Sequence, residues 1–208
     1  MALSARLLAL AACTAIVCTA CGASSAPKQR ATATVAAGSP WRGTAVEAPY
    51  RAPDFALRDQ SGRIVRLAAH RGKVTVVTFL FTQCRDVCPL IAENLASAVR
   101  RLGLLGADVR VLGVSVDPAH DTPAAVRAFV SRHHLVSQFR YLVGTHAQLR
   151  PVWQAYNVLA APKPKPDEAV DHTAYIVLVD RHGLLRVFLP PTASGADIAH
   201  DLRRLLSL

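Results

Sequence analysis

Residues 73–89 read KVTVVTFLFTQCRDVCP, and this stretch decides the fold class. Nearly all side chains of residues 73–81 are β-branched or apolar, which is typical of a central strand buried on both faces. Residues 89–102 follow with apolar side chains at helical spacing and predict a helix. The two cysteines of the stretch, Cys84 and Cys88, therefore lie at a strand-to-helix junction.

The segments around this stretch alternate between strands and helices. Residues 53–67 predict a hairpin with a glycine turn, and residues 109–116 predict a second buried strand. The next helix is expected to be capped by Thr122, to start at Pro123 and to end near His134. After it we expect a short strand at 139–142, a helix at 147–156, a hairpin at 173–189 and a closing helix at 198–206. This order predicts an α/β fold with a mixed central sheet, helices on both faces and an added N-terminal hairpin.

The first 21 residues predict export and a membrane tether. After the positively charged Arg6, the apolar run at 7–20 is short for a membrane span but has the length of a signal-peptide core. Small residues precede Cys21 and a glycine follows it, as at a bacterial lipoprotein processing site, although Cys18 stands where leucine is usual. We therefore expect residues 1–21 to be a lipoprotein-type signal segment that leaves Cys21 lipidated at the outer, extracytoplasmic or periplasmic, face of the cytoplasmic membrane. A plain signal peptide and an uncleaved anchor are the alternatives.

Composition and charge bound the rest of the chain. Residues 22–47 are rich in Ala, Ser, Thr, Gly and Pro without apolar periodicity, which predicts a flexible tether before a domain at 48–208. The chain has 24 Lys and Arg against 14 Asp and Glu, a formal charge of +10. The arginines form no block and no aromatic-rich stripe, so we expect a solvated basic surface that suits an anionic membrane, and no nucleic-acid partner. No feature demands an oligomer, and we expect a monomer.

Only Cys84 and Cys88 of the five cysteines lie in the predicted domain. An exported thiol pair meets an oxidising environment, where it can oxidise, bind a metal or cycle between states. Because a helix N-terminus carries partial positive charge, we expect the thiol pKa values to fall below their usual value of about 8.5. The i, i+4 spacing places both sulfur atoms on one face if the turn is helical, and the same spacing in a loop also permits a disulfide. A static disulfide is the structural alternative, but a bridge over so few residues would restrict the unfolded chain little.

A metal bound by this pair needs a third ligand from a distant segment. His172 directly precedes the predicted strand at 173–180, at a sheet edge where functional groups of open α/β folds gather. Taken alone, a histidine there more often makes an ordinary hydrogen bond. Two thiolates and one imidazole would favour copper(I), which tolerates low coordination, whereas zinc usually takes a fourth ligand. The other histidines of the predicted domain are His70, His120, His133, His134, His146, His182 and His200.

Four segments together resemble the Sco/SenC family. They are Cys84-Arg85-Asp86-Val87-Cys88-Pro89, Ser115-Val116-Asp117-Pro118, Asp121-Thr122-Pro123 and Val170-Asp171-His172-Thr173-Ala174, in this order. The CxxxCP segment alone is moderately specific, but its combination with the others is strong. The similarity covers residues 50–206 and implies a thioredoxin-like, membrane-anchored copper protein that serves the assembly of cytochrome c oxidase.

The resemblance implies roles for three residues. Cys84, Cys88 and His172 would be the copper ligands, and the two cysteines would also form a redox-active pair. Asp117-Pro118 and Thr122-Pro123 match as well, yet turn and helix-cap chemistry explains them, so we assign them no catalytic role.

Two functions follow from the resemblance. The first is a copper metallochaperone that helps assemble the dinuclear copper site of cytochrome c oxidase, with the copper-receiving oxidase subunit as its partner. The alternative is a specific thiol–disulfide oxidoreductase that acts on the cysteines of that subunit, although reductases of this fold normally use CxxC. A peroxiredoxin-like peroxidase is disfavoured because the position three residues before each cysteine is Phe81 or Arg85 and not threonine. Arg85 also departs from the family, which usually has proline there, but it adds positive charge and removes no ligand.

Overall fold

The computed structural model describes residues 38–160 and 173–208; residues 1–37 and 161–172 lie outside this description. Its strands are β1 (Thr44–Arg51), β2 (Ala56–Asp59), β3 (Ile64–Arg66), β4 (Val74–Leu80), β5 (Val109–Ser115), β6 (Phe139–Val143), β7 (Ile176–Val179) and β8 (Leu184–Leu189). Its helices are α1 (Val87–Arg101), α2 (Pro123–Arg132), α3 (His146–Ala155) and α4 (Gly195–Leu206), with short 3₁₀ helices η1 (Leu67–His70) and η2 (Gly103–Asp108).

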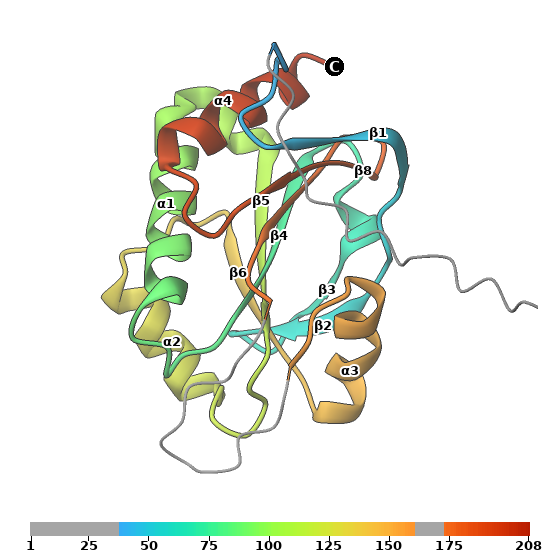
Figure 1. Ribbon diagram of the computed structural model, residues 1–208. Coiled ribbons are helices and arrows are strands. Elements are labelled where there is room, and N and C mark those ends of the chain that lie inside the picture. Colours follow the sequence, from blue (N-terminus) through green and yellow to red (C-terminus); the bar gives the residue numbers. More distant parts are fainter. Residues whose placement is uncertain (1–37, 161–172) are drawn as a thin grey trace, which may run out of the picture. The chain divides into compact units, whose positions relative to one another are not determined.

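The strands form one eight-stranded mixed sheet in the order β1-β8-β7-β4-β5-β6-β2-β3. Strands β4, β5 and β6 run parallel to one another, and the remaining pairs are antiparallel. Helices α1, α2 and α4 lie on one face and α3 lies on the other (Figure 1). The predicted mixed sheet with helices on both faces and an N-terminal hairpin, β2–β3, is confirmed.

Strand β4 is the centre of the sheet, and all seven of its residues are buried. Its register with β5 runs from Val74 opposite Val109 to Leu80 opposite Ser115, so the carboxyl ends of both strands meet at one edge. We call this the carboxyl edge and the opposite one the amino edge. Since the loop with both cysteines follows β4 directly, it lies at the carboxyl edge.

The fold begins earlier than the sequence predicted. Residues 44–47, assigned to the tether, form the first half of β1, which pairs with β8. Before this strand, the backbone N–H groups of Arg42 and Gly43 donate to the two carboxylate oxygens of the buried Asp201 in α4, at 2.8 and 2.9 Å. Most residues of β1 are exposed, so this edge strand has no apolar run that would reveal it in the sequence.

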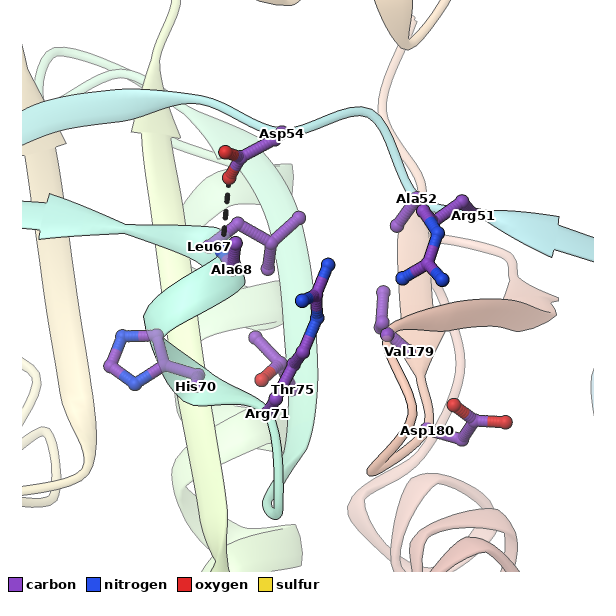
Figure 2. A pocket seen from close by; sticks show the side chains of 11 residues that line it. Arg51, Ala52, Asp54, Leu67, Ala68, His70, Arg71, Thr75, Val179 and Asp180 are labelled. Atoms are coloured by element: carbon purple, nitrogen blue, oxygen red, sulfur yellow. Dashed lines mark hydrogen bonds between the residues drawn. The ribbon is translucent and has the colours of Figure 1, made fainter.

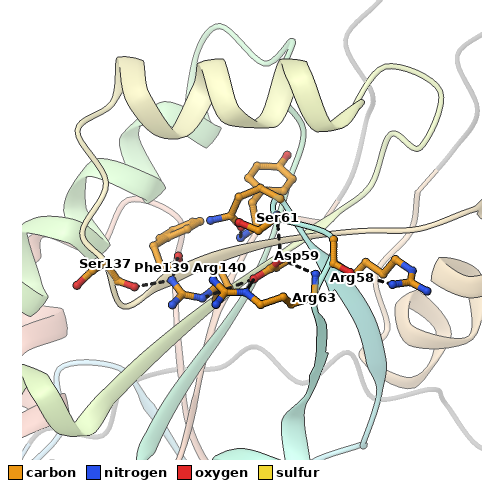
Figure 3. Close-up of polar contacts among 10 residues, drawn as sticks. Arg58, Asp59, Ser61, Arg63, Ser137, Phe139 and Arg140 are labelled. Atoms are coloured by element: carbon orange, nitrogen blue, oxygen red, sulfur yellow. Dashed lines mark hydrogen bonds and ion pairs between the residues drawn. The ribbon is translucent and has the colours of Figure 1, made fainter.

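A buried aspartate organises the β2–β3 hairpin (Figure 3). Asp59 accepts hydrogen bonds from the backbone N–H groups of Ser61 and Arg63, at 2.8 and 3.0 Å. The guanidinium groups of Arg63 and Arg140 lie 3.6 and 3.7 Å from its other oxygen. The turn and the neighbouring strand β6 therefore share one anionic anchor.

Helix starts follow ordinary capping chemistry. Thr122 caps α2 by accepting from the Ala125 N–H, and Pro123 is the first helical residue, as predicted. Helix α4 begins at Gly195, three residues before its predicted start, because Ser194 supplies its cap. In the part of the chain that the structure describes, no helix is long and apolar enough to span a bilayer.

Candidate thiol and metal site

Cys84 lies in the loop after β4, and Cys88 lies in the first turn of α1. The backbone N–H of Cys88 donates to Cys84 Sγ at 3.3 Å. This sulfur therefore occupies the helix N-terminus, where the side chain of the N-cap residue Asp86 makes no capping hydrogen bond. The Cys84 N–H donates to the Phe81 carbonyl at 3.3 Å, which closes a turn directly after the strand. The structure thus brings both cysteines into one turn, as their spacing predicted.

The two thiols differ in burial. Cys88 is fully buried and packs in the core, whereas Cys84 is only partly buried. The hydrogen bond with Cys84, together with burial, raises the pKa of Cys88 strongly, against a lowering contribution from the Phe81 backbone. The expectation that helix position would lower the thiol pKa values is therefore wrong for Cys88. The hydrogen bond with Cys84 and burial together disfavour the Cys88 thiolate more than the helix N-terminus favours it.

Asp121 belongs to one of the four matching motifs, but the sequence indicated no role for its side chain beyond the turn and helix start. Its side chain is buried at the carboxyl edge and accepts from the Thr82 N–H at 2.8 Å and the Thr82 hydroxyl at 2.7 Å. The hydroxyls of Ser115 and Tyr141 donate to its other oxygen at 2.6 and 3.0 Å. One carboxylate therefore links the cysteine loop to the end of β5 and the middle of β6.

Electrostatics couple Asp121 to the thiol pair. Burial raises the pKa of Asp121, and the hydrogen bonds from Ser115, Thr82 and Tyr141 act in the opposite direction. Its charge is one of the smaller contributions that raise the pKa of Cys88. Asp121 thus fixes the loop and also disfavours a second negative charge nearby.

The Asp117-Pro118 segment forms a turn, as expected. Asp117 accepts from the backbone N–H of Asp121 through its carbonyl at 2.9 Å, and its carboxylate contacts His120 Nδ1 at 2.9 Å. With Thr122 as a helix cap, turn and cap chemistry accounts for these matching residues.

His172, the predicted third ligand, lies outside the described residues. The chain is described again from Thr173, and β7 then pairs with β4 so that Ile176 lies opposite Thr78. The Thr78 hydroxyl donates to the Tyr175 carbonyl at 3.0 Å. Strand β7 therefore starts beside the carboxyl-terminal half of β4, the strand that leads into the cysteine loop.

Several other histidines have partners of their own. His133 Nδ1 contacts a Glu93 carboxylate oxygen at 2.8 Å, and His200 Nδ1 contacts Asp201 at 2.9 Å. The ring of His146 packs edge-on against Trp153. Within residues 38–160 and 173–208, no three His, Cys, Asp or Glu side chains converge on a metal position.

Figure 2 shows a small pocket that contains neither cysteine. It is lined by Asp54, His70 and Arg71 together with Thr75, the second residue of β4, so it belongs to the amino edge. Asp54 accepts from the Ala68 N–H at 2.9 Å at its rim. His70, one of the histidines in the sequence, is therefore remote from the cysteine pair.

A thiol pair between a central strand and the helix that follows it, in a mixed sheet covered on both faces, defines a thioredoxin-like domain. The SCO1/SenC family model matches residues 44–207 of the chain. The chain therefore belongs to the SCO1/SenC family, and the resemblance seen in its motifs is confirmed.

Individual relatives agree with this assignment. The mitochondrial SCO2 homologue of Bos taurus is 34% identical over 158 residues, 73% of this chain and 58% of that protein. The chain thus spans less than two thirds of that relative. The SCO1 homologue of Bacillus subtilis is 26% identical over 64% of this chain and 70% of its own length.

Solved structures share the fold. ScoI of Bradyrhizobium japonicum, solved with copper bound, has a TM-score of 0.66 and 32% identity, over 74% of this chain and 99% of that one. Apo Sco1 of Thermus thermophilus has a TM-score of 0.69 and 32% identity, over 79% of this chain and 96% of that one.

Proposed function

We propose that this protein is a membrane-tethered copper metallochaperone that binds copper through Cys84, Cys88 and His172. It would help to assemble the dinuclear copper site of cytochrome c oxidase, and the copper-receiving oxidase subunit would be its partner. The observation that carries the proposal is the hydrogen bond from the Cys88 N–H to Cys84 Sγ, which holds the sulfur of the loop cysteine against the first turn of α1, where the second sulfur donor lies. The copper-bound ScoI relative and the family's link to oxidase assembly support it.

The donor set fits copper as cargo. Soft thiolates select copper(I), and an imidazole would complete a three-coordinate site. Cys88 keeps its proton in the metal-free protein because its pKa is raised, so binding must displace that proton. The hydrogen bonds from Thr82 to Asp121 hold the loop that carries Cys84.

The loop is also open to a partner. Gln83, Arg85 and Asp86 are exposed around the partly buried Cys84, and Leu90 is exposed one turn further along α1. A partner cysteine can therefore approach Cys84 before it could reach Cys88. Release of the metal would begin at this exposed side.

The unequal burial of the two thiols also favours a second candidate, the specific thiol–disulfide oxidoreductase. The Cys84 thiolate would attack a disulfide of the oxidase subunit and form a mixed disulfide, and one partner sulfur would leave as a thiolate and take up a proton. Cys88 would then lose its proton and attack Cys84 Sγ. The second partner thiol is released, and the two electrons come from the Cys84–Cys88 pair.

A copper titration tests the ligand set. The reduced full-length protein is titrated with Cu(I) against a chromophoric chelator, alongside Cys84→Ser, Cys88→Ser, His172→Ala and the control His133→Ala. We expect one tightly bound Cu(I) in wild type and His133→Ala, and a large loss of affinity in the other three. Unchanged affinity in His172→Ala would remove that ligand. If the wild-type protein bound no copper but reduced a disulfide in a domain of the oxidase subunit, its function would be that of the thiol–disulfide oxidoreductase.

The membrane location is part of the proposal. We infer that Cys21 carries the lipid and that residues 22–43 connect it to the domain at the extracytoplasmic face. A SCO1/SenC family lipoprotein of Bacillus anthracis, 25% identical with a TM-score of 0.65, supports this inference.

A further inference from the structure

Four arginines and two leucines form an exposed surface at the C-terminal ends of α1 and α4, which we call the Leu-Arg face. Leu104 is 97% exposed and Leu105 is 49% exposed, both in η2. The Arg203 guanidinium donates to the Arg101 carbonyl at 2.7 Å, which joins the two helix ends, and η2 contacts both helices. The face consists of Arg100, Arg101, Leu104, Leu105, Arg203 and Arg204.

Ordinary helix chemistry explains only part of this face. Arginines in the last turn of a helix complement its dipole, and all four arginines lie at such positions. The dipole does not explain two adjacent leucines held out in solvent between them. Among the described residues, moreover, none of the four arginines forms an ion pair with a carboxylate. The face therefore combines exposed apolar side chains with arginines that, within the described ranges, contact carbonyls, a hydroxyl and an aromatic ring and no carboxylate.

The segment before β1 packs against α4 on the same side of the domain as the Leu-Arg face. The Arg204 guanidinium lies over the ring of Trp41, 5.0 Å from its centre. The N–H groups of Arg42 and Gly43 are fixed to Asp201, one turn earlier in α4. The segment that leads back to the predicted lipid anchor thus meets the fold beside the Leu-Arg face.

The face lies at the amino edge of the sheet, away from the thiols. Helix η2 immediately precedes β5 at Val109, which is paired with Val74, the first residue of β4, whereas Cys84 follows the end of β4. Seven strand residues separate the two edges by about 20 Å. The amino edge is basic beyond the face itself: besides burial, the charges of Arg110, Arg140 and Lys73 lower the pKa of His70.

We propose that the Leu-Arg face docks onto an anionic phospholipid bilayer. The leucines would enter the interface between head groups and acyl chains, and the arginines would contact lipid phosphates. Charge complementarity and the nearby entry of the tether select a lipid surface as the occupant. Docking would orient the domain so that the edge with Cys84 and Cys88 points away from the membrane, toward an extracytoplasmic domain of a partner. The inference depends on the proposed membrane tether but not on copper binding.

Hydrogen exchange on the full-length protein tests this docking. The chain is placed in lipid nanodiscs, one copy per disc, made of phosphatidylcholine alone or of phosphatidylcholine with phosphatidylglycerol. We expect amide exchange in residues 103–108 to slow severalfold only in the anionic discs, and to recover at high salt. Exchange at residues 83–86 of the thiol loop should be the same in both lipids.

Matched variants make the result specific. The double variant Leu104→Ser/Leu105→Ser should lose the slowing, whereas Leu159→Ser, which changes a 75% exposed leucine after α3, should keep it. Equal exchange in both lipids overturns the proposal. It is also overturned if the double variant behaves like wild type, or if the slowing appears only in a second set of discs that hold two copies, which would indicate a second copy as the occupant. Copper titration of the double variant should match wild type, so a failure of docking is separable from a failure of the metal site.

Discussion

Cys88 and Cys84 have the same side chain but opposite environments. Cys88 is fully buried with a raised pKa, and Cys84 is partly exposed and accepts the Cys88 N–H. One thiol therefore stays protonated in the metal-free protein, while the other faces incoming ligands. This difference leads to a pH dependence that the spacing of the cysteines alone would not predict.

Copper binding should release the Cys88 proton throughout the neutral range, because its pKa lies above that range. The logarithm of the apparent Cu(I) affinity of wild type should therefore rise with pH, and Cys88 should contribute a slope of about one per pH unit. Cys88→Ser should lose this contribution. Chelator competition between pH 6 and 8, run in parallel for both proteins, measures the two slopes. Parallel slopes would contradict the assignment of the proton to Cys88.

Asp121 acts on the thiol site through Thr82, which lies in the cysteine loop and donates two hydrogen bonds to the Asp121 carboxylate. Asn at this position keeps one acceptor oxygen. In place of the other oxygen it has an NH₂ group, which faces hydroxyl or amide donors and cannot accept their hydrogen bonds. We expect Asp121→Asn to lower the free energy of unfolding by about 2–4 kcal/mol and to weaken Cu(I) binding by about tenfold, since the cysteine loop loses its anchor at Thr82. Urea denaturation and chelator competition measure the two effects.

Thr122→Ala is the matched control for Asp121→Asn. It removes the cap of α2 at the adjacent position and should cost about 1 kcal/mol of stability without changing copper affinity. If both variants shifted copper affinity equally, Asp121 would act only through global stability.

At the scale of elements, β1 joins the tether to the core. It pairs with β8, and the segment before it is fixed by two N–H groups on the Asp201 carboxylate. Gly43 is suited to this place because a Cβ there would lie 2.5 Å from the Phe188 carbonyl oxygen. The segment before β1 is therefore held in one position by hydrogen bonds and close packing.

A chain shortened to begin at Ala48 should be less stable than one that begins at Gly38. It loses half of β1 and leaves the fully buried Asp201 without its two backbone donors, which should cost about 3 kcal/mol or more. Thermal unfolding of the two chains compares them directly. Equal midpoints would show that β1 adds no stability and that the predicted boundary at residue 48 was adequate.

At the scale of the whole molecule, the proposed lipid anchor at Cys21 would decide where the thiol chemistry takes place. In a bacterial host that processes lipoproteins, Cys21→Ser should abolish the lipid mass on the mature protein and move it from the detergent phase to the aqueous phase on phase separation. Cys18→Ser is the control and should remain lipidated. Intact-mass spectrometry of both proteins decides between a lipoprotein and a plain signal peptide, since the latter predicts no effect of Cys21→Ser.

Much of the fold was predictable because its strongest signals are local. The buried run of β4, the cap and proline of α2 and the alternation of strands and helices follow from side-chain shape and backbone preference. The i, i+4 spacing of Cys84 and Cys88 was also enough to place both in one turn. The edge strand β1 was not predictable, because its pairing with β8 and its contact with Asp201 depend on segments far away in sequence.

The sequence by itself determined the thiol pair, its strand-to-helix junction and, through four motifs, membership in the SCO1/SenC family. Only the tertiary structure decided how those thiols differ, because the hydrogen bond with Cys84 and burial in the core together raise the pKa of Cys88, despite its place at a helix N-terminus. It also decided the role of Asp121, which accepts four hydrogen bonds from Thr82 in the cysteine loop, Ser115 in β5 and Tyr141 in β6. Local chemistry can be read along the chain, whereas burial and long-range hydrogen bonding exist only after the chain has folded.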